Sequence, residues 1–462
     1  MKKSVAFILL SIALAGPLHA QGYRPDFEKI TLENGLNVLF HRDTTLPIVS
    51  VNVAYHAGSA WDPRGKHGLA NIAGTMLLTA LPQNSAAALK RLENEGSVSY
   101  AGITNVDWTN LASTFPMQHL EAALSIEADR MSKVSASITP DLVKNAVQYQ
   151  LERKNDDRKQ RLADVQPRLY AELYPEGHQY RHVSSGDTTD LRSITQADVK
   201  KFLDIFFVPA NASITIGGNF DLEQAKTLAR KYFAKIPGGK RMSWKAEDKN
   251  LPPLGSTALI KEASTEYCFL YILFSTAPLG DPGEPGLKML GHFLAGASDA
   301  RLKKALLEYN QSVLDVSATQ SSQELDGTFW VVVTCRQDAR LQLVYEQIMS
   351  FLTGTSKSDN LETKTRNGVI TETELRMARN LAEMQFLTPL EKFYGFGGRC
   401  DVLNLANLYT GNPLSPFITL QNQSEVTAFT LNDLMSKYFS IDHHVVMSIV
   451  PPGRSAQAVT LN

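Results

Sequence analysis

The residues at 67–79, which read HGLANIAGTMLLT, contain one histidine and no acidic residue. Apolar residues recur at helical spacing through this segment and predict a helix. Asn71 and Thr75 stand four positions apart and share one helical face, the spacing at which two imidazole rings reach one ion. A neutral amide or hydroxyl oxygen is a weak zinc ligand beside imidazole. Gly74, which lies between Asn71 and Thr75, has no side chain and cannot act as a general base.

A second register of the same segment retains one imidazole. It begins at His67 and reaches Asn71, but it has Ala70 at the position of a base and no second histidine. The preceding sequence, DPRG at 62–65, is typical of a turn. We therefore expect His67 to be a hydrogen-bonded or solvated turn histidine rather than a metal ligand.

Other groups of polar or glycine residues are predicted to be structural. His56 follows a predicted strand and is expected at the strand end, while His443 and His444 fall in a late turn and suit a surface or packing role. The glycines of FYGFGGRC, at 393–400, lack the preceding strand of a phosphate loop and are expected to allow close helix packing. No serine lies in a G-x-S-x-G context.

The elements that must position these residues recur in the same order along the two halves of the chain. In the first half, strands are predicted at 27–41, 47–55, 98–113 and 212–217, with helices at 69–77, 85–95, 117–131, 139–161, 194–206 and 222–233. In the second half, strands are predicted at 258–261, 266–275, 327–336 and 444–451, with helices at 285–295, 300–307, 338–351, 371–385 and 390–408. This repetition predicts two related α+β domains.

Length and composition agree with a two-domain protein. A chain of 462 residues is too long for one hydrophobic core. Residues 240–255 are polar, contain paired prolines, and are predicted to be a linker between domains at 21–239 and 256–462. The 46 Lys and Arg residues balance 47 Asp and Glu, so the charge gives no support for a nucleic-acid partner.

The N-terminal residues have the composition of a secretory signal. Lys2 and Lys3 precede an apolar run at 5–15, and LHA at 18–20 ends in a small residue at a cleavage position. Residues 1–20 are therefore predicted to be a signal peptide that exports the protein to a bacterial periplasm, with no membrane insertion after cleavage.

The cysteines do not form a disulfide framework by number or spacing. Cys268, Cys335 and Cys400 are an odd, widely spaced set, and the first two lie in apolar strand-like runs. We expect buried free thiols there, and one disulfide among the three remains an alternative.

Several stretches together resemble the M16 peptidases, the family of pitrilysin, insulysin and mitochondrial processing peptidase. Their inverted H-x-x-E-H zinc motif usually follows Gly-x-Ala and precedes Met-Leu. Here GLA at 68–70 and ML at 76–77 flank a degenerate motif, NIAGT, at 71–75. The similarity runs over 27–452 and rests on TLENGLNVLFH, VSYAGITNVDWTNLAST, VPANASITIGGNFD, GHFLAGASDARLKKALLE and GVITETELRMARN.

The resemblance implies a fold and the positions of further site residues. The expected fold is α+β, with two homologous M16-type (LuxS/MPP-like) domains, each an antiparallel-rich sheet covered by helices, that form half of a clamshell. The third zinc ligand of the family is a Glu on a later helix, where Gln150 or Glu152 stands here. These two point about 200° apart on a helix, so only one can face the cleft. An Arg and a Tyr seven residues apart in the second domain are replaced by Leu307 and Leu314.

The resemblance therefore implies an exported, catalytically inactive M16 homologue. Such a chain can pair with an active homologue, which alone would carry zinc, to close a peptide-holding chamber. The expected peptide-binding residues lie on an edge strand and bind through the backbone: Ala101, Gly102, Ile103, Thr104 and Asn105. Two alternatives remain: an active zinc metalloendopeptidase with a non-standard ligand set, and a stand-alone peptide-binding or scaffolding homodimer. No cofactor is expected in this chain.

Overall fold

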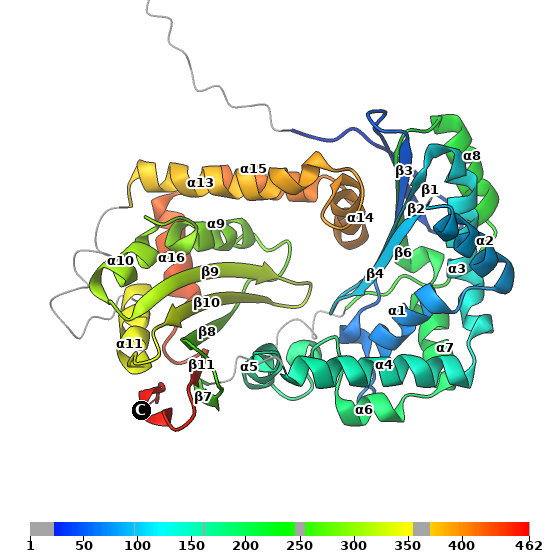
Figure 1. Ribbon diagram of the computed structural model, residues 1–462. Helices are drawn as coiled ribbons and strands as arrows, with labels where there is room; N and C mark the ends of the chain where they lie inside the picture. Colours follow the sequence, from blue (N-terminus) through cyan, green and yellow to red (C-terminus); the bar gives the residue numbers. More distant parts are fainter. Residues whose placement is uncertain (1–22, 97, 160–161, 245–254, 354–369, 462) are drawn as a thin grey trace, which may run out of the picture.

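The computed structural model describes residues 23–96, 98–159, 162–244, 255–353 and 370–461. The predicted signal peptide at 1–20 and most of the predicted linker, 245–254, lie outside these residues. Two β-sheets lie in different halves of the molecule, each with its own set of helices (Figure 1).

The first sheet has six strands in the order β1-β2-β6-β3-β5-β4, so β4 is an edge strand. Its central strand β3 is almost entirely buried although its sequence, IVSVNVAY, alternates apolar and polar residues, because both faces of the strand are covered. The strands are β1 (Glu28–Thr31), β2 (Asn37–Arg42), β3 (Ile48–Tyr55), β4 (Ser99–Thr104), β5 (Thr109–Pro116) and β6 (Ala212–Gly218).

The second sheet has five strands in the order β7-β11-β8-β10-β9. The parallel pair β7–β11 corresponds to the parallel pair β2–β6 of the first sheet, and the pairs that follow are antiparallel in both. The two halves therefore share one topology, and the predicted α+β fold with two antiparallel-rich sheets is confirmed. The strands are β7 (Thr257–Glu262), β8 (Cys268–Thr276), β9 (Val313–Ser322), β10 (Gly327–Cys335) and β11 (Val445–Val450).

Helices of the first half pack on one face of the first sheet and close the first core. Val51, Val53, Ile72 and Leu124 are fully or almost fully buried there, because each helix turns an apolar stripe toward the strands. The helices are α1 (Leu69–Thr79), α2 (Gln83–Asn94), α3 (Leu120–Ser137), α4 (Pro140–Lys159), α5 (Val165–Leu173), α6 (Thr188–Ser193), α7 (Gln196–Phe206) and α8 (Leu222–Phe233).

Helices of the second half build a second core around β8 and β10. Leu290, Phe329 and Ile348 are completely buried there. The helices are α9 (Glu284–Ala295), α10 (Arg301–Tyr309), α11 (Leu341–Thr353), α13 (Glu372–Leu387), α14 (Arg399–Thr410), α15 (Ser415–Ser424) and α16 (Ala428–Tyr438). Short 3-10 helices complete the chain: η1 (Ser59–Trp61), η2 (Met117–His119), η3 (Gln179–Arg181), η4 (Pro209–Asn211), η6 (Thr388–Glu391) and η7 (Ser455–Gln457).

The helix predicted at 390–408 is wrong in its first part. Gly395 and Gly397 adopt left-handed φ angles of 73° and 78°, so the chain turns before α14 begins at Arg399. The carboxylate of Asp401 accepts the backbone N–H of Gly397 at 2.7 Å and fixes this turn. These glycines therefore supply a turn and not the close helix packing that the sequence had suggested.

Helix α14 crosses from the second half to the open face of the first sheet (Figure 1). The side-chain amide of Asn404, completely buried, donates to the backbone carbonyls of Asn52 and Ser213, both at 3.0 Å. The side-chain amide of Asn407 donates to the Ser213 hydroxyl at 2.8 Å. Helix α14, which the sequence places in the second domain, thus covers the polar face of the first sheet.

The prediction that the cysteines are buried free thiols is confirmed. Cys268, Cys335 and Cys400 are buried and free, although Cys335 and Cys268 are direct cross-strand partners. Burial raises the pKa of the Cys335 thiol to about 12, so it is protonated and unreactive at neutral pH. None of the helices in the described ranges combines the length and apolar character of a membrane span.

Candidate functional site

The helix that carries the degenerate motif, α1, is anchored by a buried aspartate. The carboxylate of Asp62 accepts the backbone N–H groups of Gly68 and Ala70, both at 2.7 Å. Burial raises the pKa of Asp62 to about 7, against the helix N–H groups that favour the charged form. The turn predicted at 62–65 is therefore also the N-terminal cap of the motif helix, a role that its sequence did not reveal.

A hydrogen bond joins two neutral amides at the ligand positions of the motif. The Nε2 of Gln150 on α4 donates to the Oδ1 of Asn71 on α1. Gln150 is 3% exposed, whereas Glu152 lies on the exposed face of α4 and accepts a bond from Gln148 Nε2 at 2.7 Å. Of the two residues left open by the sequence, Gln150 is the one that faces Asn71.

The space beside Gly74 is occupied by the neighbouring edge strand. A Cβ atom at Gly74 would lie 2.3 Å from the Oγ1 of Thr104 on β4. That hydroxyl is 3.1 Å from the hydroxyl of Thr109, which in turn donates to the carbonyl of Ala57 at 2.7 Å. The hydroxyl of Thr75 donates to the carbonyl of Asn71 at 3.0 Å, so it is bonded within its own helix.

These residues do not fit a catalytic zinc ion. Zinc in peptidases takes imidazole and carboxylate ligands, whereas the side chains that meet here are two amides and a hydroxyl. Within the part of the chain that the structure describes, no three His, Cys, Asp or Glu side chains are grouped so that they could hold a metal ion. The position therefore offers neither an ionisable base nor a strong metal-binding donor set.

His67 lies at the start of α1 and has structural partners. Its ring stacks on that of His182 with centroids 3.6 Å apart, and its Nε2 is 4.0 Å from a carboxylate oxygen of Asp190. Its backbone N–H donates to the same carboxylate at 3.1 Å. Burial lowers the pKa of His67, which keeps the ring neutral at neutral pH.

A cavity of about 860 Å³ opens between α1, α4 and the edge strand β4. The amide pair and Gly74 lie in its wall. Among the residues expected to bind peptide, three line it, namely Gly102, Ile103 and Thr104. Ala101 does not line it, and the carbonyl of Asn105 is bonded to the first N–H of η1 at 3.1 Å. The expected peptide-binding stretch is therefore only partly at the cavity.

The backbone of β4 presents alternate hydrogen-bonding groups to the cavity side. The N–H of Asn105 donates to the carbonyl of Trp108 at 2.7 Å, so that pair closes the β4–β5 hairpin. Bonded and non-bonded pairs alternate along an antiparallel ladder. By that alternation, Tyr100, Gly102 and Thr104 direct their N–H and C=O groups away from β5, toward the open edge. An added strand could therefore bond to these three residues.

The two second-domain positions lie far from this cavity. Leu307 on α10 is half-buried and packs against the second core, and Leu314 on β9 is 40% exposed. Figure 1 shows α10 at the far side of the second half from α1. Arg301, at the start of α10 and six positions before Leu307, binds the carboxylate of Glu374 through two bonds at 2.8 and 2.6 Å, so it has a structural role.

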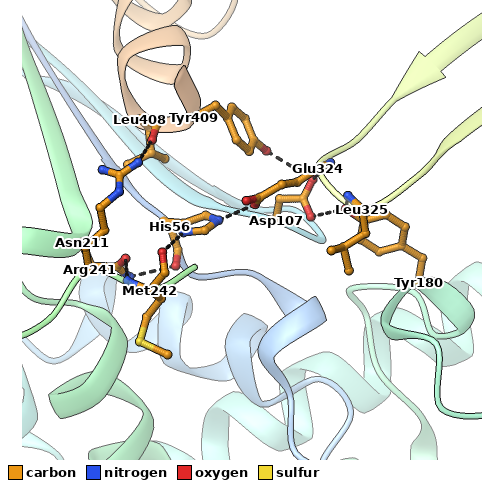
Figure 2. Close-up of polar contacts among 10 residues, drawn as sticks. All are labelled: His56, Asp107, Tyr180, Asn211, Arg241, Met242, Glu324, Leu325, Leu408 and Tyr409. Atoms are coloured by element: carbon orange, nitrogen blue, oxygen red, sulfur yellow. Dashed lines mark hydrogen bonds and ion pairs between the residues drawn. The ribbon is translucent and has the colours of Figure 1, made fainter. Parts of the chain in front are cut away.

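His56 lies directly after β3, at the strand end as predicted, but it is buried. It is 3% exposed, and its Nε2 lies 2.5 Å from Oε2 of Glu324 in the β9–β10 turn (Figure 2). Its Nδ1 lies 3.1 Å from the carbonyl of Met242. Because Glu324 is distant in sequence, only the approach of the second half buries this histidine.

Asp107 is the centre of the same contact between the halves (Figure 2). Its carboxylate accepts the hydroxyl of Tyr180 at 2.6 Å, the hydroxyl of Tyr409 at 3.3 Å and the backbone N–H of Glu324 at 3.1 Å. Burial raises the pKa of Asp107 to about 6. The β4–β5 turn is thus tied to both α14 and the β9–β10 turn.

His444 is packed inside the second half, so of the surface and packing roles expected for it, the packing role is confirmed. It is 1% exposed and its Nε2 lies 2.8 Å from the hydroxyl of Tyr345. Burial lowers the pKa of His444 to about 4, so the ring is neutral at neutral pH.

Comparisons with known proteins agree with this fold. A family model described as the peptidase M16 inactive domain matches residues 193–380. The zinc protease PqqE of Helicobacter pylori is 20% identical over 387 residues, which cover 83% of this chain and 84% of that protein.

Solved structures with the same fold include two informative chains. The peptidase M16 inactive domain from Pseudomonas fluorescens matches with a TM-score of 0.76 at 18% identity, covering 92% of this chain and 98% of that one. A chain of Complex III2 from Candida albicans matches with a TM-score of 0.71 at 14% identity, covering 92% and 95%. The family model, the curated relative and the shared fold together support the assignment of this chain to the M16 peptidase family.

Proposed function

We propose that this chain is a catalytically inactive M16 homologue that keeps the peptide groove and acts as the non-catalytic partner of an active zinc peptidase. The proposal depends on one observation above all: Gln150 donates to Asn71 where the family binds zinc. Both amides are neutral over the whole physiological range and neither can deprotonate water.

The position of the general base supports the same proposal. A peptidase of this type needs a carboxylate beside the metal-bound water. Gly74 has no side chain, and the hydroxyl of Thr104 occupies the space into which one would project. A threonine hydroxyl with a bond to Thr109 has no basicity at neutral pH. Loss of a general base alone typically lowers a rate by roughly 10²–10⁴-fold.

The groove itself needs no metal to bind a peptide. An extended chain that adds to β4 would bond to the outward backbone groups of Tyr100, Gly102 and Thr104. Such main-chain bonds supply affinity without chemistry at a side chain. A peptide could therefore be held here and cleaved by an active subunit that faces it.

The partner and the location belong to the same proposal. One chain of this fold is part of Complex III2 of Candida albicans, so the fold is known in a multi-subunit assembly. The basic and apolar residues of 1–20 support export to the periplasm, where the active partner would also have to be. We propose that the chain forms a heterodimer with an active homologue, and a homodimer is the second candidate.

One specific observation keeps an active enzyme as the second candidate. The H. pylori relative is called a zinc protease, and it matches 83% of this chain. For this chain the same activity would need a ligand set other than Asn71, Thr75 and Gln150.

The decisive experiment measures metal, cleavage and partner together. Purified chain is incubated with zinc, desalted and assayed for zinc content, then for cleavage of casein and of peptide mixtures with and without chelator. We expect less than stoichiometric zinc and no chelator-sensitive cleavage. An affinity-tagged chain should retain an intact H-x-x-E-H homologue from the same cells, and adding the chain should increase that homologue's cleavage of peptides. Stoichiometric zinc with cleavage by this chain alone would contradict the proposal.

A further inference from the structure

The cavity beside β4 has two chemically different ends, and α4 runs antiparallel to α1 along it. Gln150 contacts Asn71 near the middle of the cavity. One turn farther along α4, the ammonium of Lys154 donates to the carbonyl of Gly186 at 2.6 Å. The backbone of Gly186 touches that of Gly68 at the start of α1. The C-terminal part of α4 therefore lies beside the N-terminal part of α1.

One end of the cavity is apolar. Leu78, Leu111 and Leu142 line it together with Ala146. Gly102 of β4 lies directly against this group, because a Cβ atom there would be 3.0 Å from Leu78. An apolar side chain of a bound peptide would lose water contact at this end.

The other end is basic. Among the residues that line the cavity, the charged side chains are Arg153 and Lys154, and no carboxylate is present. Arg153 is exposed, with its guanidinium carbon 6.0 Å from the ring centroid of Tyr149, itself 55% exposed. Lys154 contributes less to this charge, because it is bonded to Ser185 and Gly186 and interacts with Asp187. Arg153 is thus the residue best placed to meet an anionic group in the cavity.

The distance between the two ends fixes a spacing in the ligand. Leu142 and Arg153 are eleven positions apart on α4, which is a rise of about 16 Å. An extended strand rises about 3.3 Å per residue, so this distance corresponds to about five residues of a bound peptide. Of the β4 residues that would bond to such a strand, Gly102 and Thr104 line the same cavity, and Tyr100 precedes them on β4.

We propose that this groove selects an extended peptide in which an apolar side chain and a carboxylate are separated by about four to six residues, with an even spacing where both groups are side chains on one face of the strand. The inference rests on the peptide binding proposed above and adds a sequence preference to it. A strand antiparallel to β4 would bring an Asp or Glu side chain to Arg153, N-terminal to the apolar residue. A strand parallel to β4 would bring the C-terminal carboxylate there, because Thr104, beside Gly74, lies nearer the basic end than Gly102, beside Leu78.

The test uses fluorescein-labelled ten-residue peptides and fluorescence anisotropy on the purified chain. Two amidated peptides carry Glu either four or six residues before Leu, because only an even spacing puts both side chains on one face of a strand, and matched peptides carry Gln or Lys in place of Glu. Another peptide ends in a free carboxylate five residues after Leu and is compared with its amide. We expect a Glu peptide or the free-acid peptide to bind about three- to fivefold more tightly than its neutral match, the range for a partly exposed ion pair.

Two variants separate a contact with Arg153 from a general effect of charge. Arg153→Glu should reverse the order of the Glu and Lys peptides. Lys144→Glu makes the same change of charge on an exposed face of α4 outside the cavity and should leave the order unchanged. Since both residues are exposed, neither substitution should impair folding, and circular dichroism melts will check this.

The outcomes distinguish this inference from the proposed function. If no peptide binds, peptide binding itself is contradicted, and with it the inference. If peptides bind with equal affinity whatever the charge, or if Arg153→Glu and Lys144→Glu behave alike, the sequence preference is overturned while the groove remains a peptide site. Loss of binding by peptides with N-methylated backbone at alternate residues would show that strand addition to β4 carries the interaction.

Discussion

Replacing Gly74 with alanine tests the contact that closes the base position. An ideal Cβ at Gly74 would lie 2.3 Å from Thr104 Oγ1 and 3.3 Å from Thr109 Cγ2. A real Cβ does not tolerate the first distance, so Thr104 must rotate or β4 must move away from α1. Rotation breaks the 3.1 Å contact between the hydroxyls of Thr104 and Thr109.

The expected cost follows from three opposing contributions. Overpacking costs about 1–3 kcal/mol, and the lost hydrogen bond costs about 1 kcal/mol. Alanine in place of glycine inside a helix returns about 1 kcal/mol. We therefore expect Gly74→Ala to lower the free energy of unfolding by about 1–3 kcal/mol in the wild-type chain. In a Thr104→Ala background the clash is absent, and the same substitution should instead stabilise by about 1 kcal/mol.

Equilibrium urea denaturation, followed by circular dichroism, measures all four members of this double-mutant cycle. Thr104→Ser is the matched control because it keeps the hydroxyl and should keep the penalty. If Gly74→Ala changes stability equally in the wild-type and Thr104→Ala backgrounds, or stabilises the wild-type chain, then Thr104 does not fill the position beside Gly74 and the reasoning is refuted.

Substitutions at three further residues test the contacts that hold the groove. Asp107 has a folded-state pKa of about 6, above its ordinary value of 3.8. Its contribution to stability is therefore full below pH 4 and falls by about 3 kcal/mol as pH rises through 6. Asp107→Asn should flatten that part of the pH profile, measured by urea melts at pH 4.5 and 7.5. Asn404→Ala should cost about 2–4 kcal/mol of unfolding free energy because it removes the side-chain bonds to two buried carbonyls of the first sheet. Asn404→Asp should cost more, because a carboxylate cannot donate to these carbonyls. Equal melting temperatures for the wild type and both variants would contradict this. Asp62→Ala should destabilise by about 2 kcal/mol in thermal melts through loss of the α1 cap, whereas Asp62→Asn, which keeps one acceptor, should lose about half as much.

The edge strand β9 and the turn before α14 show where prediction from periodicity failed. The sequence VLDVSATQSS of β9 is largely polar in its second part, because an edge strand exposes one side, and no strand was predicted there. The FYGFGGRC stretch was joined to a helix, although two of its glycines take left-handed φ angles. Local patterns are weakest where an element is exposed or where glycine allows two conformations.

The sequence by itself determined what the motif cannot do. The types of Asn71, Gly74 and Thr75, at helical spacing, exclude an H-x-x-E-H site at these positions whatever the fold, because side-chain chemistry does not depend on tertiary context. The order of strands and helices also revealed the duplication, since periodicity is a local property. The family resemblance then supplied the positions of Gln150 and Glu152 but did not choose between them.

Only the tertiary structure decided which residues meet. It brought Gln150 to Asn71 and Glu324 to His56, pairs separated by 79 and 268 positions, and it placed Thr104 against Gly74. It also laid α14 across the first sheet. Contacts between residues so far apart depend on how whole helices and sheets pack, and no local pattern of apolar and polar residues encodes that packing.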